Sequence, residues 1–175
     1  QEKYIAIMKD RAELMKQLTE ELFRYSVILS DESEPETEEV FINQALQESI
    51  SSFYPALSDK GITPQIILTD KRIIRKVNEA AIYRVFSNLL NNAVKYSDGD
   101  LEITLSDMGE IKFTNTAKEL SAVEVEQLFD RFYTVEVAHH STGLGLSIAR
   151  TLVERMGGTI TADYKNDRLT ITITL

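Results

Sequence analysis

The segment from residue 79 to residue 96 carries two stripes of side chains at helical spacing, one apolar and one polar, which predicts a helix packed on a core by one face. The first stripe is apolar and predicts a helix face packed on a core: Ile82, Val85, Phe86, Leu89, Leu90, Ala93 and Val94. The second is polar and repeats in steps of three or four: Arg84, Asn88, Asn92, Lys95 and Tyr96. Asparagine is a mediocre helix former, because its amide competes for backbone hydrogen bonds. The polar stripe is therefore either an ordinary solvated face or a set of ligands.

A second segment carries groups that could bind a phosphate beside the polar stripe. Residues 141–150 read Ser-Thr-Gly-Leu-Gly-Leu-Ser-Ile-Ala-Arg, so two glycines directly precede an amphipathic helix. Glycine lets the backbone approach an anion, and the first turn of a helix presents free N–H groups. Amide oxygens suit Mg²⁺, and a lysine offers a point charge to a phosphate. Each signal is weak alone, because a glycine pair also makes tight turns and this one lacks the P-loop spacing.

The rest of the chain alternates between strand and helix patterns. Strands are expected at 40–42, 65–69, 72–77, 101–106, 111–114, 159–164 and 169–175, and further helices at 43–57, 122–129 and 144–156. Asn43 is expected to cap the helix that follows it. Because most neighbouring strands are joined by hairpins, the sequence predicts an α+β fold. We expect a two-layer α/β sandwich with helices on one face of a mixed sheet, preceded by a long N-terminal helix.

The N-terminal region differs from this pattern. Met8, Met15, Leu22 and Leu29 recur every seven residues in a stretch without glycine or proline. This spacing predicts a helix packed in a bundle or coiled coil, and the alternative is an amphipathic helix lying on the following domain. An acidic run around Pro35 follows, which like-charge repulsion keeps from packing. We expect three parts: a helix (1–31), an acidic hinge (32–39) and a domain (40–175).

Composition excludes some functions. The net charge of −9 argues against general nucleic-acid binding, because phosphates would be repelled. The absence of cysteine excludes disulfides and thiolate metal sites and fits a cytoplasmic protein. No apolar run approaches the roughly 20 residues that span a bilayer. Since the chain begins with Gln1 rather than Met, we expect a fragment, attached to a membrane only through segments absent from this chain.

Three motifs stand along the chain: residues 88–97, Asn-Leu-Leu-Asn-Asn-Ala-Val-Lys-Tyr-Ser; residues 128–133, Leu-Phe-Asp-Arg-Phe-Tyr; and residues 143–148, Gly-Leu-Gly-Leu-Ser-Ile. Together they resemble a known family, the sensor histidine kinases of bacterial two-component systems. They are similar, in that order, to the family's asparagine box, phenylalanine box and C-terminal glycine box. The motifs come in the family's order and spacing. The resemblance covers residues 40–175, and the first helix resembles the second helix of the family's dimerisation and phosphoacceptor hairpin.

The resemblance implies a role for each motif residue. Asn92 is expected to be the main Mg²⁺ ligand, and Asn88 to assist at the metal or the phosphates. Lys95 is expected to contact a phosphate, and Tyr96 to lie against the adenine ring. The phosphates of ATP are expected to meet the backbone of the glycine box: Thr142, Gly143, Leu144 and Gly145. Phe132 is expected to pack in a lid that runs from about residue 116 to residue 142.

The chain also departs from the family pattern. Asn115 takes the place of an aspartate that accepts a hydrogen bond from the adenine amino group, and Ala117 replaces a glycine. An amide oxygen still accepts but lacks the charge that strengthens the bond, so we expect weaker ATP binding. Thr134 stands where many members have an arginine. The only histidines, His139 and His140, are expected to be exposed lid residues, so the phosphoacceptor histidine and its general base lie outside this chain.

The implied function is that of an ATP-dependent protein-histidine kinase catalytic fragment. It would transfer the γ-phosphoryl group of ATP, with Mg²⁺, to a histidine outside this chain for relay to a response regulator. The full protein is expected to form a homodimer through the N-terminal helix bundle. One alternative is a degenerate ATP-binding scaffold or sensor module without kinase activity, favoured by Asn115, Ala117 and Thr134. Another is an ATPase of the same fold class, such as a chaperone or topoisomerase domain.

Overall fold

The computed structural model describes residues 2–30, 36–120, 125, 127–133 and 142–175 of the 175-residue chain. The elements follow in chain order: α1 (Glu2–Ser30), β1 (Glu38–Phe41), α2 (Ile42–Asp59), β2 (Gln65–Leu68), β3 (Ile74–Val77), α3 (Glu79–Tyr96), β4 (Glu102–Leu105), β5 (Ile111–Thr116), α5 (Gly145–Arg155), β6 (Thr159–Lys165) and β7 (Arg168–Thr174). The predicted α+β class is confirmed. The helix expected at 122–129 falls largely outside the described residues.

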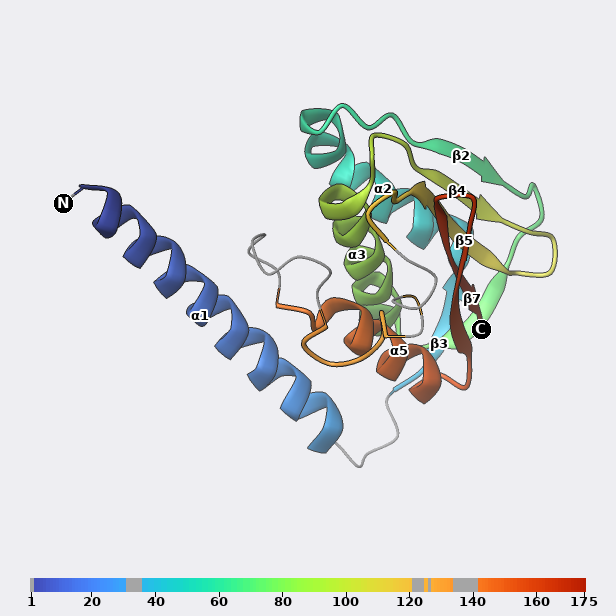
Figure 1. Cartoon of the computed structure of the whole chain (residues 1–175). Coiled ribbons are helices and arrows are strands. Elements are labelled where there is room, and N and C mark those ends of the chain that lie inside the picture. The colour runs from blue at the N-terminus through green and yellow to red at the C-terminus, as the bar shows by residue number, and fades with distance from the viewer. Residues whose placement is uncertain (1, 31–35, 121–124, 126, 134–141) are drawn as a thin grey trace.

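The main sheet has five strands in the order β2-β4-β5-β7-β6. β2 pairs with β4 in parallel and the other neighbours are antiparallel, so the sheet is mixed, as expected. β1 and β3 form a separate antiparallel pair. Helices α2, α3 and α5 lie together on one side of the sheet, whereas α1 extends away from it (Figure 1). The second layer of the sandwich is therefore helical.

The core forms where the apolar stripe of α3 meets the inward face of the sheet. Phe86 is fully buried, and its ring centroid lies 6.3 Å from that of Phe113 on β5. In β7 the apolar residues are buried and alternate with threonines: Leu169, Ile171 and Ile173. This two-residue period matches a sheet with one packed face and one polar face. Burying the apolar stripe of α3 in this way leaves its polar stripe at the edge of the core.

Asn43 does not cap α2, and this prediction is wrong. The helix begins at Ile42, and Asn43 lies buried in its first turn. Its Nδ2 donates to the carbonyl oxygens of Thr69 and Lys71 at 3.1 and 3.0 Å, and its Oδ1 accepts from the backbone N–H of Ile73 at 3.0 Å. The loop between β2 and β3 has no neighbouring strand that could bond these backbone groups, so the Asn43 side chain supplies their hydrogen bonds.

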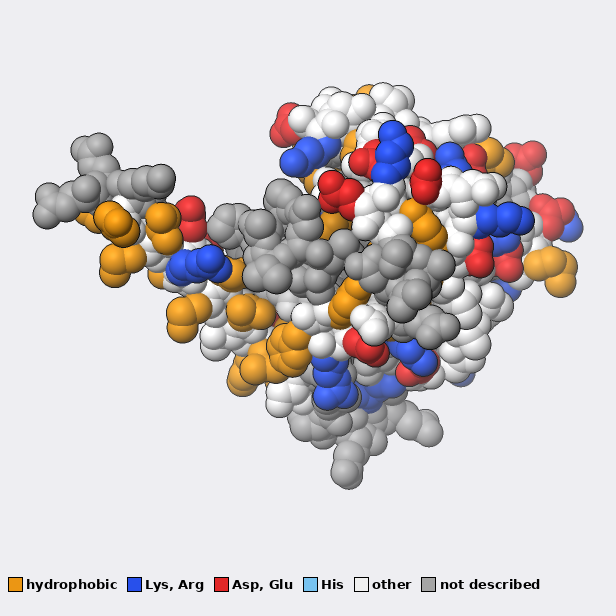
Figure 2. Space-filling model, viewed as in Figure 1, with side chains coloured by type: hydrophobic (Ala, Val, Ile, Leu, Met, Phe, Trp, Pro, Cys, Tyr) orange, Lys and Arg blue, Asp and Glu red, His pale blue; other side chains and the backbone are white. Residues whose placement is uncertain are grey.

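Helix α1 keeps much of its apolar surface in contact with solvent. Met8 is 71% exposed, Met15 69% and Leu22 49%, and these are members of the seven-residue stripe. Orange side chains along this protruding helix are visible in the space-filling view (Figure 2). Glu38 and Glu39, expected in the hinge, belong instead to β1. None of the helices in the described part of the chain combines the length and the hydropathy needed to cross a membrane.

Candidate functional site

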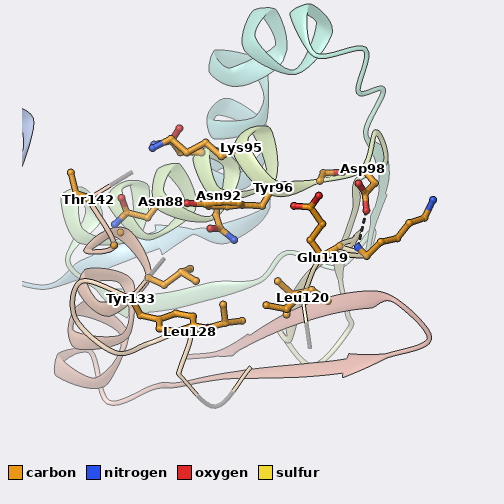
Figure 3. A pocket seen from close by; sticks show the side chains of 18 of the residues that line it. Asn88, Asn92, Lys95, Tyr96, Asp98, Glu119, Leu120, Leu128, Tyr133 and Thr142 are labelled. Carbon is orange, nitrogen blue, oxygen red and sulfur yellow. Dashed lines mark hydrogen bonds between the residues drawn. The ribbon is translucent and has the colours of Figure 1, made fainter. Parts of the chain in front are cut away.

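A pocket opens between α3 and three later segments: residues 117–120, 128–133 and 142–146 (Figure 3). Its lining is mostly polar on the side of α3 and mostly apolar on the side facing it. The residues that line it are Glu21, Asn88, Asn91, Asn92, Lys95, Tyr96, Ser97, Asp98, Ala117, Lys118, Glu119, Leu120, Leu128, Tyr133, Thr142, Gly143, Gly145, Leu146 and Leu169. Segments more than fifty residues apart in the sequence thus meet around one hollow.

The polar stripe of α3 forms one wall of this pocket. Asn88, Asn92, Lys95 and Tyr96 all line it, as their spacing on one helix face predicts. The Nδ2 atom of Asn88 is buried and has no hydrogen-bond partner within the described part of the chain. A buried donor left unpaired costs about 1–3 kcal/mol. Such a donor beside a pocket indicates a place for a polar ligand.

The glycine segment forms the facing wall. Gly143 has a φ of +67°, and a Cβ at this position would lie 2.5 Å from the backbone carbon of Phe132. The backbone N–H of Phe132 donates to the carbonyl of Gly143 at 3.0 Å, which holds the phenylalanine-box segment against the glycine segment. Only glycine tolerates both this conformation and this contact. The close packing explains why the residue type is needed here.

Helix α5 points its beginning towards the same hollow. It starts at Gly145, and the preceding residue, Leu144, provides no side-chain cap. The first N–H groups of a helix have no partner within the helix, and the positive end of the helix dipole lies beside them. At Gly145 a Cβ would lie 3.8 Å from Oδ1 of Asn88, so α3 and α5 come close together at this point. This arrangement suits an anion held between the two helices.

Three predicted site residues do not line the pocket. Asn115 is buried on β5, and its Nδ2 donates to the carbonyl of Thr116 at 3.0 Å. Leu144 is fully buried, so only its backbone is placed to contribute. Phe132 is 57% exposed, with a φ of 64°. Thr134, His139 and His140, like much of the predicted lid, lie outside the described residues.

Sequence reasoning missed several charged residues of the pocket. Asp98 follows α3, and its carboxylate accepts from the backbone N–H of Lys118 at 2.8 Å, which fixes the loop after β5. Glu119 lies on that loop and lines the pocket, and so does Glu21 of α1. The Ser97-Asp98-Gly99 turn was a detectable signal for Asp98, whereas nothing in the sequence pattern joins Glu21 to residues more than sixty positions away.

The side of the pocket that faces α3 is largely apolar. Leu120, Leu128, Leu169 and Tyr133 line it. Figure 3 shows Leu120, Leu128 and Tyr133 across the hollow from Asn88, Asn92 and Tyr96 of α3. A flat aromatic base fits between apolar and aromatic side chains, and phosphates fit beside amides, a lysine and helix N–H groups. The described residues contain no cluster of three or more His, Cys, Asp or Glu side chains, so a cation here would depend on amide and phosphate oxygens.

The shifted pKa values lie elsewhere. The Tyr83 hydroxyl donates to the Glu48 carboxylate between α3 and α2, which raises the pKa of Tyr83 to about 12 and lowers that of Glu48. A hydrogen bond from Thr69 and another from Lys71 lower the pKa of Asp107. None of these groups lines the pocket. They connect elements of the fold.

Comparison with known proteins gives a consistent relationship. Residues 77–175 match the family described as histidine kinase-, DNA gyrase B- and HSP90-like ATPases. The chain is 30% identical to sensor histidine kinase YcbM of Bacillus subtilis over 184 residues, covering 99% of this chain and 59% of YcbM. It is 30% identical to sensor protein VanSC of Enterococcus gallinarum over 181 residues, covering 99% of this chain and 50% of VanSC. The chain thus spans only part of the length of these relatives.

Solved structures show the same fold. The Acinetobacter baumannii histidine kinase AdeS superposes with a TM-score of 0.74 at 20% identity, covering 99% of this chain and 83% of that one. Histidine kinase ThkA, solved in complex with response regulator protein TrrA, superposes with a TM-score of 0.78 at 22% identity, covering 98% of this chain and 49% of that one. The family match spans more than half of the sequence. The chain therefore belongs to the histidine kinase-, DNA gyrase B- and HSP90-like ATPase family, and its resemblance to bacterial sensor histidine kinases is confirmed.

Proposed function

We propose that this chain is the ATP-binding catalytic part of a protein-histidine kinase in a two-component system. The observation that carries the proposal is the meeting of two motifs in one pocket. The asparagine stripe of α3 and the glycine segment before α5 lie on facing walls, with an unpaired buried amide between them. Members of this ATPase family bind ATP, and the curated relatives are named as sensors. The transfer of phosphate by this chain is our inference from that pocket.

On the polar side, the chain's own groups hold the triphosphate. We assign Asn92 as the main Mg²⁺ ligand through its amide oxygen, with Asn88 beside it at the metal or the phosphates. Lys95 neutralises phosphate charge, and Thr142, Gly143, Leu144 and Gly145 contribute backbone N–H groups. A bound Mg²⁺ would supply positive charge that offsets the negative charge developing during transfer. The protein's part is therefore to position the phosphates and neutralise them rather than to form bonds.

Towards the apolar side, the adenine ring would lie among Tyr96 and the leucines. Asn115 is proposed to accept from the adenine amino group through Oδ1, because its Nδ2 is already bonded to the carbonyl of Thr116. It is buried at the base of this region and does not line the hollow, so it would act only on a deeply inserted base. Phe132 is proposed to pack against a closed lid, since its ring is largely exposed here.

The remaining elements of the proposal concern partners. The γ-phosphoryl group would pass to a histidine outside this chain and then to a response regulator; ThkA is one histidine kinase solved with such a partner. Helix α1 would join a homodimeric bundle, with its exposed seven-residue stripe at the interface. Residues 32–37 would act as a hinge between that bundle and the domain, whose first strand begins at Glu38. The kinase part would work on the cytoplasmic side of a membrane-bound sensor.

A non-enzymatic role is the second candidate. Asn115 and Ala117 replace residues that the family uses at the nucleotide, and a scaffold or sensor module could tolerate both changes. The asparagines, the lysine and both glycines of the pocket favour the kinase, because an ATP-binding scaffold does not need the full set of groups that neutralise a phosphate during its transfer. A chaperone-like or topoisomerase-like ATPase is favoured by no specific observation in the pocket.

The experiment that tests the proposed kinase activity adds a histidine that can accept the phosphoryl group. A helix that carries the phosphoacceptor histidine is joined ahead of Gln1, and ATP labelled on the γ-phosphate is added with Mg²⁺. We expect acid-labile, base-stable label on that histidine, lost when Asn92 is changed to Ala. Gln47→Ala is the matched control, because Gln47 also carries a side-chain amide on a helix but is exposed and does not line the pocket. Nucleotide binding without any phosphohistidine would favour the scaffold, and the release of free phosphate by the chain alone would favour another ATPase.

A further inference from the structure

Helix α1 reaches the pocket through one carboxylate. The hydroxyl of Thr142, in the glycine segment, donates a hydrogen bond to the Glu21 side chain. Glu21 is half-buried and lines the same pocket as Asn88, Asn92 and Lys95. Glu21 therefore both accepts a hydrogen bond from the glycine segment and borders the hollow. A negative charge therefore stands at the end of the pocket where the phosphates are proposed to lie.

Thr142 is held between α1 and the glycine segment. Its side chain is buried, and its Oγ1 also lies 3.4 Å from the backbone nitrogen of Leu144, at the entrance to α5. A hydroxyl has one hydrogen to donate. A phosphate oxygen at this position would compete with the Glu21 carboxylate for that hydrogen. Phosphate binding and the contact between α1 and the glycine segment therefore oppose each other.

We propose that Glu21 determines which form of the nucleotide this pocket accepts, by disfavouring metal-free phosphate and favouring the Mg²⁺ complex. This inference rests on the proposed nucleotide-binding function. A free di- or triphosphate brings several negative charges beside the carboxylate, which repels them. The bound cation removes two of those charges and itself attracts the carboxylate. Glu21 thus sets the metal dependence of binding, although it comes from a helix outside the family's nucleotide motifs.

The size of the effect follows from the distances involved. A phosphate that replaces the carboxylate at Thr142 would lie within roughly one Debye length of it, in a pocket open to solvent. Coulomb repulsion at that range, with water-like dielectric and salt screening, corresponds to about a three- to tenfold change in affinity. With Mg²⁺ bound, the net charge of the ligand is much smaller, so the expected change is below about twofold. Measuring affinity with and without Mg²⁺ therefore separates the effect of the Glu21 charge from a change in the shape of the pocket.

The experiment measures dissociation constants by calorimetry for ADP, in excess Mg²⁺ and in excess chelator. Glu21→Gln removes the charge but keeps an oxygen that can accept from Thr142. Glu20→Gln is the matched control, because Glu20 carries the same charge on the same turn of α1 and is exposed. Glu21→Asp keeps the charge and is the rescue variant. Adenosine, which has no phosphate, reports on the rest of the pocket.

We expect Glu21→Gln to bind metal-free ADP about three- to tenfold more tightly than the unmodified chain, so that the preference for Mg²⁺ falls by a similar factor. Glu20→Gln and Glu21→Asp keep the original preference, and adenosine affinity is unchanged throughout. Equal preference in Glu21→Gln and the unmodified chain would overturn the inference while leaving nucleotide binding intact. If no variant binds ADP under either condition, the proposed function itself fails.

Discussion

The α/β sandwich and helix α1 use similar apolar periodicities with opposite results. In the sandwich, the stripe of α3 meets the sheet and is buried, and Phe86 is 0% exposed. In α1, the described members of the seven-residue stripe stay largely exposed, and Met15 is 69% exposed. A repeating pattern of apolar residues therefore specifies a helix and a face, but only the surrounding chain decides whether that face is covered. The sheet of the sandwich covers the apolar face of α3, whereas the apolar face of α1 stays largely exposed.

The largest expected effect separates the two regions by stability. Phe86→Ala removes a ring packed on Phe113 and should lower the free energy of unfolding by about 3–5 kcal/mol, through lost burial and a cavity. Met15→Ala should change it by less than about 0.5 kcal/mol, because its side chain is already exposed. Urea titrations followed by circular dichroism measure both. Similar losses in the two variants would mean that α1 belongs to the same cooperative core.

The glycine segment should show an intermediate effect. Gly143→Ala forces a positive φ on a side chain and drives its Cβ against the backbone of Phe132. We expect a loss of roughly 1–3 kcal/mol of stability together with weaker nucleotide binding, because the facing wall of the pocket shifts. Gly157→Ala is the control: it has a positive φ too, but open space around it. If Gly157→Ala weakens binding as much, strain alone explains the effect and the contact with Phe132 is irrelevant.

A third variant tests whether the sandwich depends on polar groups in its interior. Asn43→Ala leaves the N–H of Ile73 and two carbonyl groups without their partner. We expect a loss of about 1–3 kcal/mol in the free energy of unfolding. Gln47→Ala, at an exposed position of the same helix, serves as the control and should stay close to zero. An unchanged midpoint for Asn43→Ala would show that water replaces these bonds at no cost.

The smallest effect concerns the surface link between α2 and α3. The raised pKa of Tyr83 means that its contribution to stability is fully present below pH 10 and is lost as the pH rises through about 12. The lowered pKa of Glu48 means that its contribution is present above pH 4.5 and is lost as the pH falls through the lowered value. The difference in stability between the unmodified chain and Tyr83→Phe should therefore shrink at both extremes. Tyr54→Phe, on an exposed ring, gives the baseline across pH.

The sequence was informative where local signals agreed. The bounds of α3, Glu79 to Tyr96, were predicted as observed from the apolar period, and the structure adds the cap, Asn78, whose side chain accepts from the N–H of Ala81. β7 was predicted by its alternation of apolar residues with threonines. In the pocket, the motif residues of α3 and most of the glycine segment were predicted to meet, and they do.

The rest depended on contacts between distant segments. Asn43 was expected to cap its own helix, but it instead satisfies a loop nearly thirty residues later. Glu21 and Thr142 are 121 residues apart, and no periodicity connects them. Asp98 supports the loop at Lys118 through one backbone hydrogen bond, which has no signature in residue type. A hydrogen bond between residues that are far apart in the sequence cannot be predicted from local sequence patterns.

The central claim is that the two walls of this pocket bind the phosphates of a nucleotide with Mg²⁺. Calorimetric titration of the unmodified chain with ATP and Mg²⁺ tests it most directly, with Asn92→Ala measured alongside. We predict saturable binding at one site per chain, weakened at least about tenfold in Asn92→Ala, as the loss of a charge-assisted contact of about 1.5–3 kcal/mol implies. The absence of any heat of binding at millimolar ATP, in a chain shown to be folded, would contradict the claim.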